Sequence, residues 1–225
     1  TATENKLVLK SELISATVDG KYQLSKVGNA IINQINKYYA FGKVTNVPPQ
    51  RIRFTANIYN PKFLQDFVPA LTTFAPSKIN GLIDTEKDSL LMNAVFPKVT
   101  YNGINLDSIK LNVANEAEKL DYKLFVNSIQ NTSIALFNTE VSGSAANNKL
   151  DLNVFLRDRQ RKDKYVIAGI FQSINKDFRF NLDPEKLLLD YEKWTVAPDN
   201  YIQFGNSGIL AHEFNISQGS QLLSI

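Results

Sequence analysis

Apolar and polar residues alternate along most of this chain, and this period-two pattern constrains the fold more than any other feature. In the segment RIRFTANIY, residues 51–59, Ile52, Phe54 and Ile58 alternate with Arg51 and other polar residues. Successive side chains of a β-strand point to opposite faces of its sheet. Each segment of this kind therefore has one apolar and one wet face, which is typical of antiparallel sheets.

The alternation recurs in the segments around residues 109–113, 120–126, 150–156, 166–170 and 178–182. We expect on the order of twelve strands separated by short turns. If the strands form a curved sheet, its apolar side chains line a groove or fill a core. The candidate groove-lining residues are Ile52, Phe54, Ile58, Ile109, Leu111, Val113, Leu150, Leu152, Val154, Leu156, Val166 and Ile170.

Four dipeptides mark expected turns or breaks. Asp19-Gly20 and Asn102-Gly103 are typical of type I′ hairpin turns, because both tolerate positive φ angles. Asn80-Gly81 and Asn147-Asn148 are predicted as further breaks between strands. The pattern thus predicts a succession of hairpins.

Helix is expected only between roughly residues 25 and 75. The segment 24–40 has apolar residues at helical spacing, with Ser25 as the predicted N-cap. A shorter helix is predicted to begin at Asn60 and to end or bend at Pro69. The expected class is a mostly β protein: a curved antiparallel sheet, U-shaped or sandwich-like, with one or two short helices.

Residues 1–225 are interpreted as a single β-rich unit, because no segment resembles a domain linker. The chain starts at Thr1, without methionine or a signal sequence. We therefore expect a fragment of a longer protein. No apolar run approaches the length of a membrane-spanning helix.

A basic cluster lies between two alternating segments. Residues 157–164 hold five Lys or Arg and two Asp, and 5 − 2 = +3 equals the net charge of the whole chain. Nucleic-acid-binding proteins usually spread their basic residues over a face, so no nucleic-acid partner is expected. The flanking alternation instead predicts a β-hairpin whose solvated tip is this cluster, and such a tip can contact anionic lipid headgroups or a protein partner.

The residues of most catalytic and metal sites are scarce. The chain has no cysteine and a single histidine, His212, which is interpreted as a structural or surface residue of an alternating strand. Glu116 and Glu118 would be the acid pair of a hydrolase, but their charged break between two strands favours solvated loop acids. We therefore expect no enzyme activity, no cofactor and no metal.

Aromatic residues are frequent, and the sequence leaves two interpretations of them open. Trp194 and Tyr201 belong either to the sheet core or to an exposed platform. An exposed platform would make the protein a β-sandwich module that binds glycan or protein. That reading is the alternative to a groove.

Two stretches resemble the AsmA/TamB family of bacterial envelope proteins, in its very long form. One is FRFNLDPEKLLLDYEKWTVAPDNYIQFGNSGILAHEFNIS, residues 178–217, and the other is KLVLKSELISATVDGKYQLSKVGNAIINQINKYY, residues 6–39. Together they cover about a third of the chain. The shared motifs are architectural, and none of them is catalytic.

The resemblance implies a periplasmic location, with an inner-membrane anchor outside this segment. It also implies an apolar β-trough that lets phospholipid acyl chains pass between membranes, or a scaffold for outer-membrane assembly that works with an outer-membrane barrel partner. The sequence lacks the family's anchor and its terminal partner-binding region, so neither role transfers directly to this segment.

Overall fold

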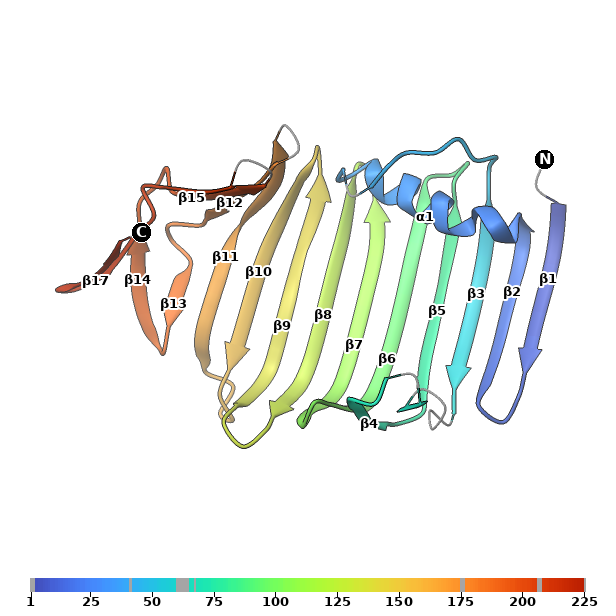
Figure 1. The fold of residues 1–225 in the computed structure, drawn as a ribbon, viewed down its shortest axis with the longest axis horizontal. Helices are drawn as coiled ribbons and strands as arrows, with labels where there is room; N and C mark the ends of the chain where they lie inside the picture. The colour runs from blue at the N-terminus through green and yellow to red at the C-terminus, as the bar shows by residue number, and fades with distance from the viewer. Residues whose placement is uncertain are drawn as a thin grey trace.

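The computed structural model describes residues 3–40, 42–59, 65–66, 68–174, 177–205 and 208–224. Within these residues the chain forms eighteen β-strands and one α-helix. The expected class, a mostly β protein with a curved antiparallel sheet and a short helix, is confirmed. The strands outnumber the expected dozen because the C-terminal part is divided into seven short ones (Figure 1).

The central strands pair in chain order through short connections, and β6 to β9 and β11 are the longest, with 12 or 13 residues. They are β5 (Ser77–Asp84), β6 (Ser89–Tyr101), β7 (Ile104–Glu116), β8 (Lys119–Gln130), β9 (Ala135–Ala146), β10 (Lys149–Arg157) and β11 (Asp163–Ile174). The N-terminal side continues the sheet as β3 (Arg51–Ile58), β2 (Ile14–Tyr22) and β1 (Thr3–Lys10). The short β4 (Leu71–Phe74) pairs with the last residues of β6.

The sheet divides after β11, which pairs with both β12 and β13. One branch contains β12 (Asp177–Leu182), β15 (Tyr201–Gly205) and β16 (Gly208–His212). The other contains β13 (Leu187–Leu189), β14 (Glu192–Val196), β17 (Asn215–Gln218) and β18 (Gln221–Ser224). The branches enclose the C-terminal cluster, which consists of Leu182, Leu187, Val196, Phe214 and Ile216.

A single helix crosses one face of the long sheet near one end of its strands (Figure 1). The chain enters it through a 3-10 turn, Leu24–Lys26, and α1 spans Val27–Asn36. The prediction that Ser25 caps the helix is wrong, since Lys26 holds the N-cap position and makes no side-chain cap bond. The residues after the helix pack on the sheet in the helix-side cluster, which consists of Tyr38 and Tyr39 with Ile83, Leu90, Leu120 and Ala145, and Ile31 and Ile35 of α1 pack against it.

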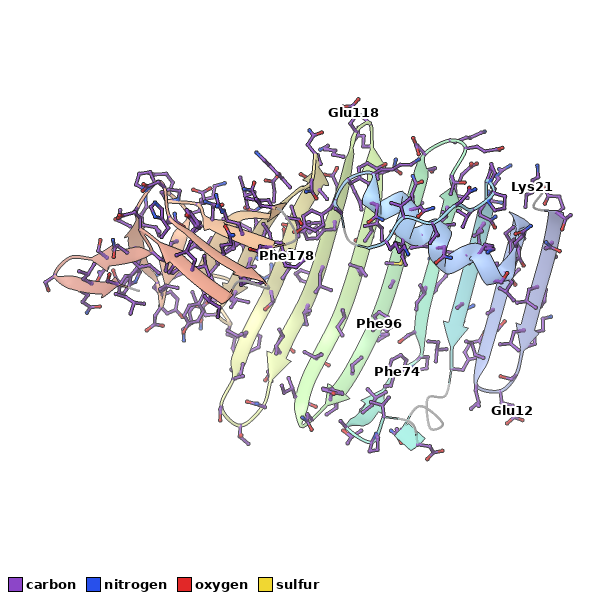
Figure 2. The ribbon with its side chains drawn as sticks, turned by 45° about the horizontal axis from the view of Figure 1, so that its top comes forward. Glu12, Lys21, Phe74, Phe96, Glu118 and Phe178 are labelled. Atoms are coloured by element: carbon purple, nitrogen blue, oxygen red, sulfur yellow. The ribbon has the colours of Figure 1, made fainter. Side chains whose placement is uncertain are left out.

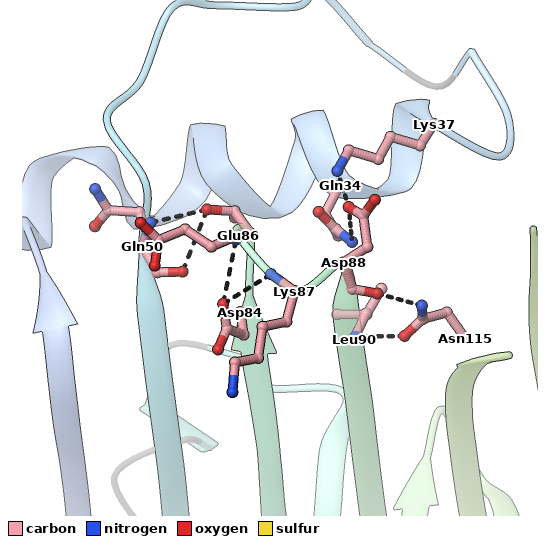
Figure 3. A network of polar contacts seen from close by, with 10 residues as sticks. Gln34, Lys37, Gln50, Asp84, Glu86, Lys87, Asp88, Leu90 and Asn115 are labelled. Carbon is pink, nitrogen blue, oxygen red and sulfur yellow. Dashed lines mark hydrogen bonds and ion pairs between the residues drawn. The ribbon is translucent and has the colours of Figure 1, made fainter. Parts of the chain in front are cut away.

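Polar contacts hold α1 against the turn between β5 and β6 (Figure 3). Gln34 Nε2 donates to Asp88 Oδ1 over 3.3 Å, and Lys37 forms an ion pair with the same carboxylate. Asn115 accepts the Leu90 N–H over 2.6 Å and donates to the Asp88 carbonyl. The helix is therefore fastened to the strand ends, in addition to its apolar packing.

The predicted turns divide into two groups. Asn102-Gly103 joins β6 to β7 with φ angles of 52° and 75°, and Asn147-Asn148 joins β9 to β10, so both predictions are confirmed. Asp19-Gly20 lies inside β2 and Asn80-Gly81 inside β5, so both of these predictions are wrong. The helix predicted from Asn60 falls largely on residues 60–64 and 67, which lie outside the described residues.

Close packing explains Gly20 and Gly81, the two glycines that are predicted in turns but lie inside strands. Gly20 has a φ of 128° inside β2, next to the backbone of Arg51 in β3. A Cβ atom on Gly81 would lie 2.6 Å from Cζ of Phe54, whose ring covers this glycine from the neighbouring strand. Glycine therefore marks close approaches within the sheet here, which is its second common use in strands.

Candidate functional site

One continuous apolar face runs across the long sheet. Directly paired residues of antiparallel strands project to the same face. Through this pairing Ile52 aligns with Ile83, and Ile83 aligns with Leu90. The same face continues through each pair of neighbouring strands from β3 to β10. Ten of the twelve candidate groove-lining residues share it: Ile52, Phe54, Ile58, Ile109, Leu111, Val113, Leu150, Leu152, Val154 and Leu156.

Val166 and Ile170 lie on the opposite face, which corrects their place in the expected groove. Leu150 pairs with Phe171, whereas Ile170 pairs with Asp151. The residues of β11 that share the apolar face are therefore Tyr165, Ile167, Gly169 and Phe171. Both phases of β11 are apolar, and the register of the hairpin decides which phase faces the groove.

The apolar face is covered only in part. Strands β6 and β7 each have 13 residues and so span about 40 Å. The 10-residue α1 is about 15 Å long and about 10 Å wide, so it covers one band across the strand ends. Beyond that band, side chains of the face including Ile58, Leu111, Leu124 and Val154 are half-buried, and Phe96 meets the Phe74 ring of β4 at 5.9 Å between centroids. Figure 1 shows no second described helix over these strands.

The opposite face of the same strands is mostly polar, although exposed Leu91, Val95 and Ile170 lie on it. Lys123 Nζ pairs with Glu140 Oε2 at 2.9 Å, and Asn112 donates to Asn93 over 2.6 Å. Burial opposes the charge on Glu140, but Lys123, Ser142 and Arg157 outweigh it, so the pKa of that carboxyl is lowered. A depression of about 720 Å³ on this side is lined largely by polar residues such as Asp121, Ser144, Asn153 and Lys186. The two faces thus differ in chemistry, one being apolar and the other mostly polar.

Tyr122 is a polar exception on the apolar face, and the alternation alone does not reveal its role. It pairs with Gly143 in β9, and its hydroxyl reaches past this glycine to donate to the Asp151 carbonyl in β10 over 2.7 Å. The β9–β10 ladder has no Cα partner for Asp151 at this point. Burial, and then the Asp151 carboxylate, raise the pKa of Tyr122 to about 12.

The basic cluster forms the connection between β10 and β11, as the sequence predicts. It lies at the end of β10 away from α1 (Figure 1), since the backbone N–H of Asn148, just before β10, donates to the Tyr38 carbonyl on the helix side. Arg157 pairs with Asp163 at 2.8 Å, and Lys164 pairs with Asp190 of the β13–β14 turn at 3.5 Å. The Tyr191 hydroxyl of that turn donates to Asp158 over 2.9 Å. The loop is therefore ordered by contacts with its neighbour.

The other candidate residues occupy separate places. Exposed His212 ends β16, and its ring stacks on Tyr201 at 4.8 Å between centroids. Arg179 Cζ lies 4.0 Å from the same Tyr201 ring, while Trp194 packs against the C-terminal cluster. Glu116 and Glu118 are exposed at the β7–β8 turn. Within the described parts of the chain, no group of three or more His, Cys, Asp or Glu residues is arranged to hold a metal ion.

The sheet has unpaired edges at both ends. In the described residues β1 pairs only with β2, and all eight of its residues are exposed. At the other end β16 pairs only with β15 and carries Ile209, which is 83% exposed. A long unpaired edge offers a row of backbone groups to a further strand.

No family model, curated protein or solved structure matches this chain. None of the described helices is long and apolar enough to cross a membrane. The functional argument therefore depends on the geometry of the sheet.

Proposed function

We propose that this chain is a non-enzymatic segment of a bacterial envelope-spanning protein of the AsmA/TamB kind. Its apolar sheet face accommodates phospholipid acyl chains in the periplasm as they move between membranes. One observation carries the proposal: an apolar face on strands about 40 Å long is covered, in the part of the chain that the structure describes, by a helix over only one band. Acyl chains suit such a surface because they need no hydrogen-bond partners.

A scaffold for outer-membrane assembly, working with a barrel partner, is the second form of this proposal. The unpaired edges of β1 and β16 support it, because a strand of a partner can extend the sheet there. The glycan-platform reading gains less support. Trp194 lies against the C-terminal cluster, and the ring of Tyr201 is already engaged by His212 and Arg179.

The test uses two adjacent residues of β7 on opposite faces. The sequence contains no cysteine, so Leu111→Cys and Lys110→Cys each provide a single site for a fluorescent label. Leu111 lies on the apolar face and Lys110 on the polar face. We expect phospholipid with a nitroxide on its acyl chain to quench the label at residue 111 several-fold more than the label at residue 110.

A water-soluble nitroxide serves as the control for simple exposure, because it should quench the label at residue 110 at least as well. Equal quenching of both positions by the lipid probe would contradict an acyl-binding face. Lipid extracted from the purified protein and identified by mass spectrometry would then decide whether any lipid is carried at all.

A further inference from the structure

We propose that the β10–β11 loop docks the protein on the headgroups of an anionic phospholipid bilayer. The surface consists of Arg159, Arg161 and Lys162 with the rings of Phe137 and Tyr191. This inference rests on the proposed function for its purpose, since it names where lipid reaches the apolar face. It adds a membrane-binding surface that the apolar face alone does not require.

The charge of the loop is only partly neutralised by its neighbours. Asp163 forms an ion pair with Arg157, and Asp190 forms one with Lys164. Asp158 accepts hydrogen bonds from the Tyr191 hydroxyl and from the Lys162 backbone N–H. Within the described residues, Arg159, Arg161 and Lys162 have no carboxylate within ion-pair distance. All three are exposed at the tip, so three cations face solvent together.

Aromatic rings lie directly beneath these cations. Arg159 Cζ is 5.4 Å from the centroid of Phe137, and Lys162 Nζ is 4.9 Å from that of Tyr191. Basic residues combined with aromatic rings, of which Tyr191 also has a polar hydroxyl, are typical of membrane-surface segments. A nucleic-acid surface would instead extend the positive charge along a groove with stacking rings.

The position of the loop also fits a lipid surface. It lies at the strand ends opposite α1, next to the uncovered band of the apolar face (Figure 1). Leu156 and Val154 are the residues of β10 on that face that lie next to the loop in sequence. An acyl chain leaving a bilayer at the loop would therefore meet uncovered apolar side chains first, and not the helix.

The test compares two triple variants that remove the same charge. Arg159→Gln, Arg161→Asn and Lys162→Gln neutralise the loop, and Asn suits position 161 because its φ is 66°. Arg53→Gln, Lys78→Gln and Lys110→Gln neutralise three exposed residues on the polar face of the sheet. Each set lowers the net charge from +3 to 3 − 3 = 0.

Binding is measured by co-sedimentation with vesicles of phosphatidylcholine and phosphatidylglycerol, and with phosphatidylcholine alone. A basic residue near an anionic surface contributes about fivefold to partitioning, so the loop variant should bind the mixed vesicles roughly 100-fold more weakly. The sheet variant should bind nearly as well as the unchanged protein. Added salt should weaken the binding of the unchanged protein.

Three results would overturn the inference: equal loss in both variants, no preference for the anionic vesicles, or full competition by inorganic phosphate or an oligonucleotide at low concentration. The quenching assay at Leu111 separates this failure from failure of the proposed function. A loop variant that loses vesicle binding but keeps quenching by dispersed lipid supports both. Vesicle binding without quenching at residue 111 would leave the docking surface and remove the acyl-binding face.

Discussion

The two ends of the sheet cover their apolar face by different means. At the C-terminal end, two branches of strands close over the C-terminal cluster (Figure 2). Near the N-terminal end, one helix and the segment after it lie on the helix-side cluster. The ends of the strands away from α1 have no described helix over them (Figure 1), so the described part of the molecule contains a closed region, a helix-covered region and an open one.

Buried polar groups show how the two covered regions differ. Asn200 is fully buried beside the C-terminal cluster, and its side chain accepts the Leu182 N–H over 2.9 Å and donates to the Leu182 and Ala197 carbonyls. On the helix side, Gln34 Oε1 and the Tyr39 hydroxyl are buried without a hydrogen-bond partner in the described part of the chain. An unsatisfied buried polar group costs free energy. The helix-side region should therefore open more easily.

The largest test of this comparison is Asn200→Ala. The substitution leaves the buried N–H and carbonyl of Leu182 without partners, so we expect a loss of about 3–5 kcal/mol in the free energy of unfolding. Urea denaturation followed by circular dichroism measures it. The exposed Asn127→Ala is the control and should change stability by less than about 0.5 kcal/mol. A loss below about 1 kcal/mol for Asn200→Ala would show that the closed region does not depend on this network.

A second test places excess volume under the helix. Ala30 is fully buried where α1 meets the sheet, so Ala30→Leu should cost about 1–3 kcal/mol. We expect faster hydrogen exchange in α1 and unchanged protection in β12–β14, since only the helix-side region opens. Gly28→Ala is the matched control because a Cβ there meets nothing within 4 Å, and it should stabilise the helix by about 0.5–1 kcal/mol. Simultaneous loss of protection in both regions would mean that the molecule opens as one unit.

The part of the apolar face next to the helix-side cluster is tested at Tyr122, whose partner Val113 packs against that cluster. Tyr122→Phe removes the hydrogen bond to Asp151 and should cost about 1 kcal/mol. Because the folded pKa of about 12 exceeds the ordinary value of 10.0, the folded state favours the protonated phenol. This contribution to stability is complete below pH 10 and is lost as the pH rises from 10 to about 12.

Absorbance of tyrosinate in the unchanged protein and in Tyr122→Phe isolates this group, since the difference between the two titrations belongs to it. A difference curve centred near pH 10 would contradict the environment described for the hydroxyl. Asp151→Asn should lower the pKa of Tyr122, because the Asp151 carboxylate is the second cause of its rise.

The alternation predicts most strands because it depends on local chemistry. The strands at residues 51–58 and the hairpin around the basic cluster follow directly from it. The phase of β11 does not, since β11 is apolar in both phases and a register shift lies between Leu156 and Arg157. A bulge of this kind changes which residues share a face, and the sequence of one strand does not specify it.

The glycines and the C-terminal end show the same limit. Asp19-Gly20 has turn chemistry, but the turn forms at Ser11, whose hydroxyl accepts the N–H groups of Leu13 and Ile14. A glycine is needed at position 20 because the backbone of β3 approaches closely there, and this contact is distant in sequence. The branching after β11 likewise depends on long-range packing, so the sequence predicts an apolar face there but not its closure.

The smallest expected effect is that of Tyr39→Phe. It makes the same chemical change as Tyr122→Phe, so the two variants compare the two sites directly. Tyr39→Phe removes a buried hydroxyl that has no partner in the described residues, and burial already raises the pKa of this phenol. The ring contact with Phe171, at 6.4 Å between centroids, is retained. We therefore expect no loss and a gain of up to about 1 kcal/mol, measured by urea denaturation at neutral pH. A loss equal to that of Tyr122→Phe would mean that the hydroxyl is satisfied in solution, and the helix-side region would then be as complete as the closed one.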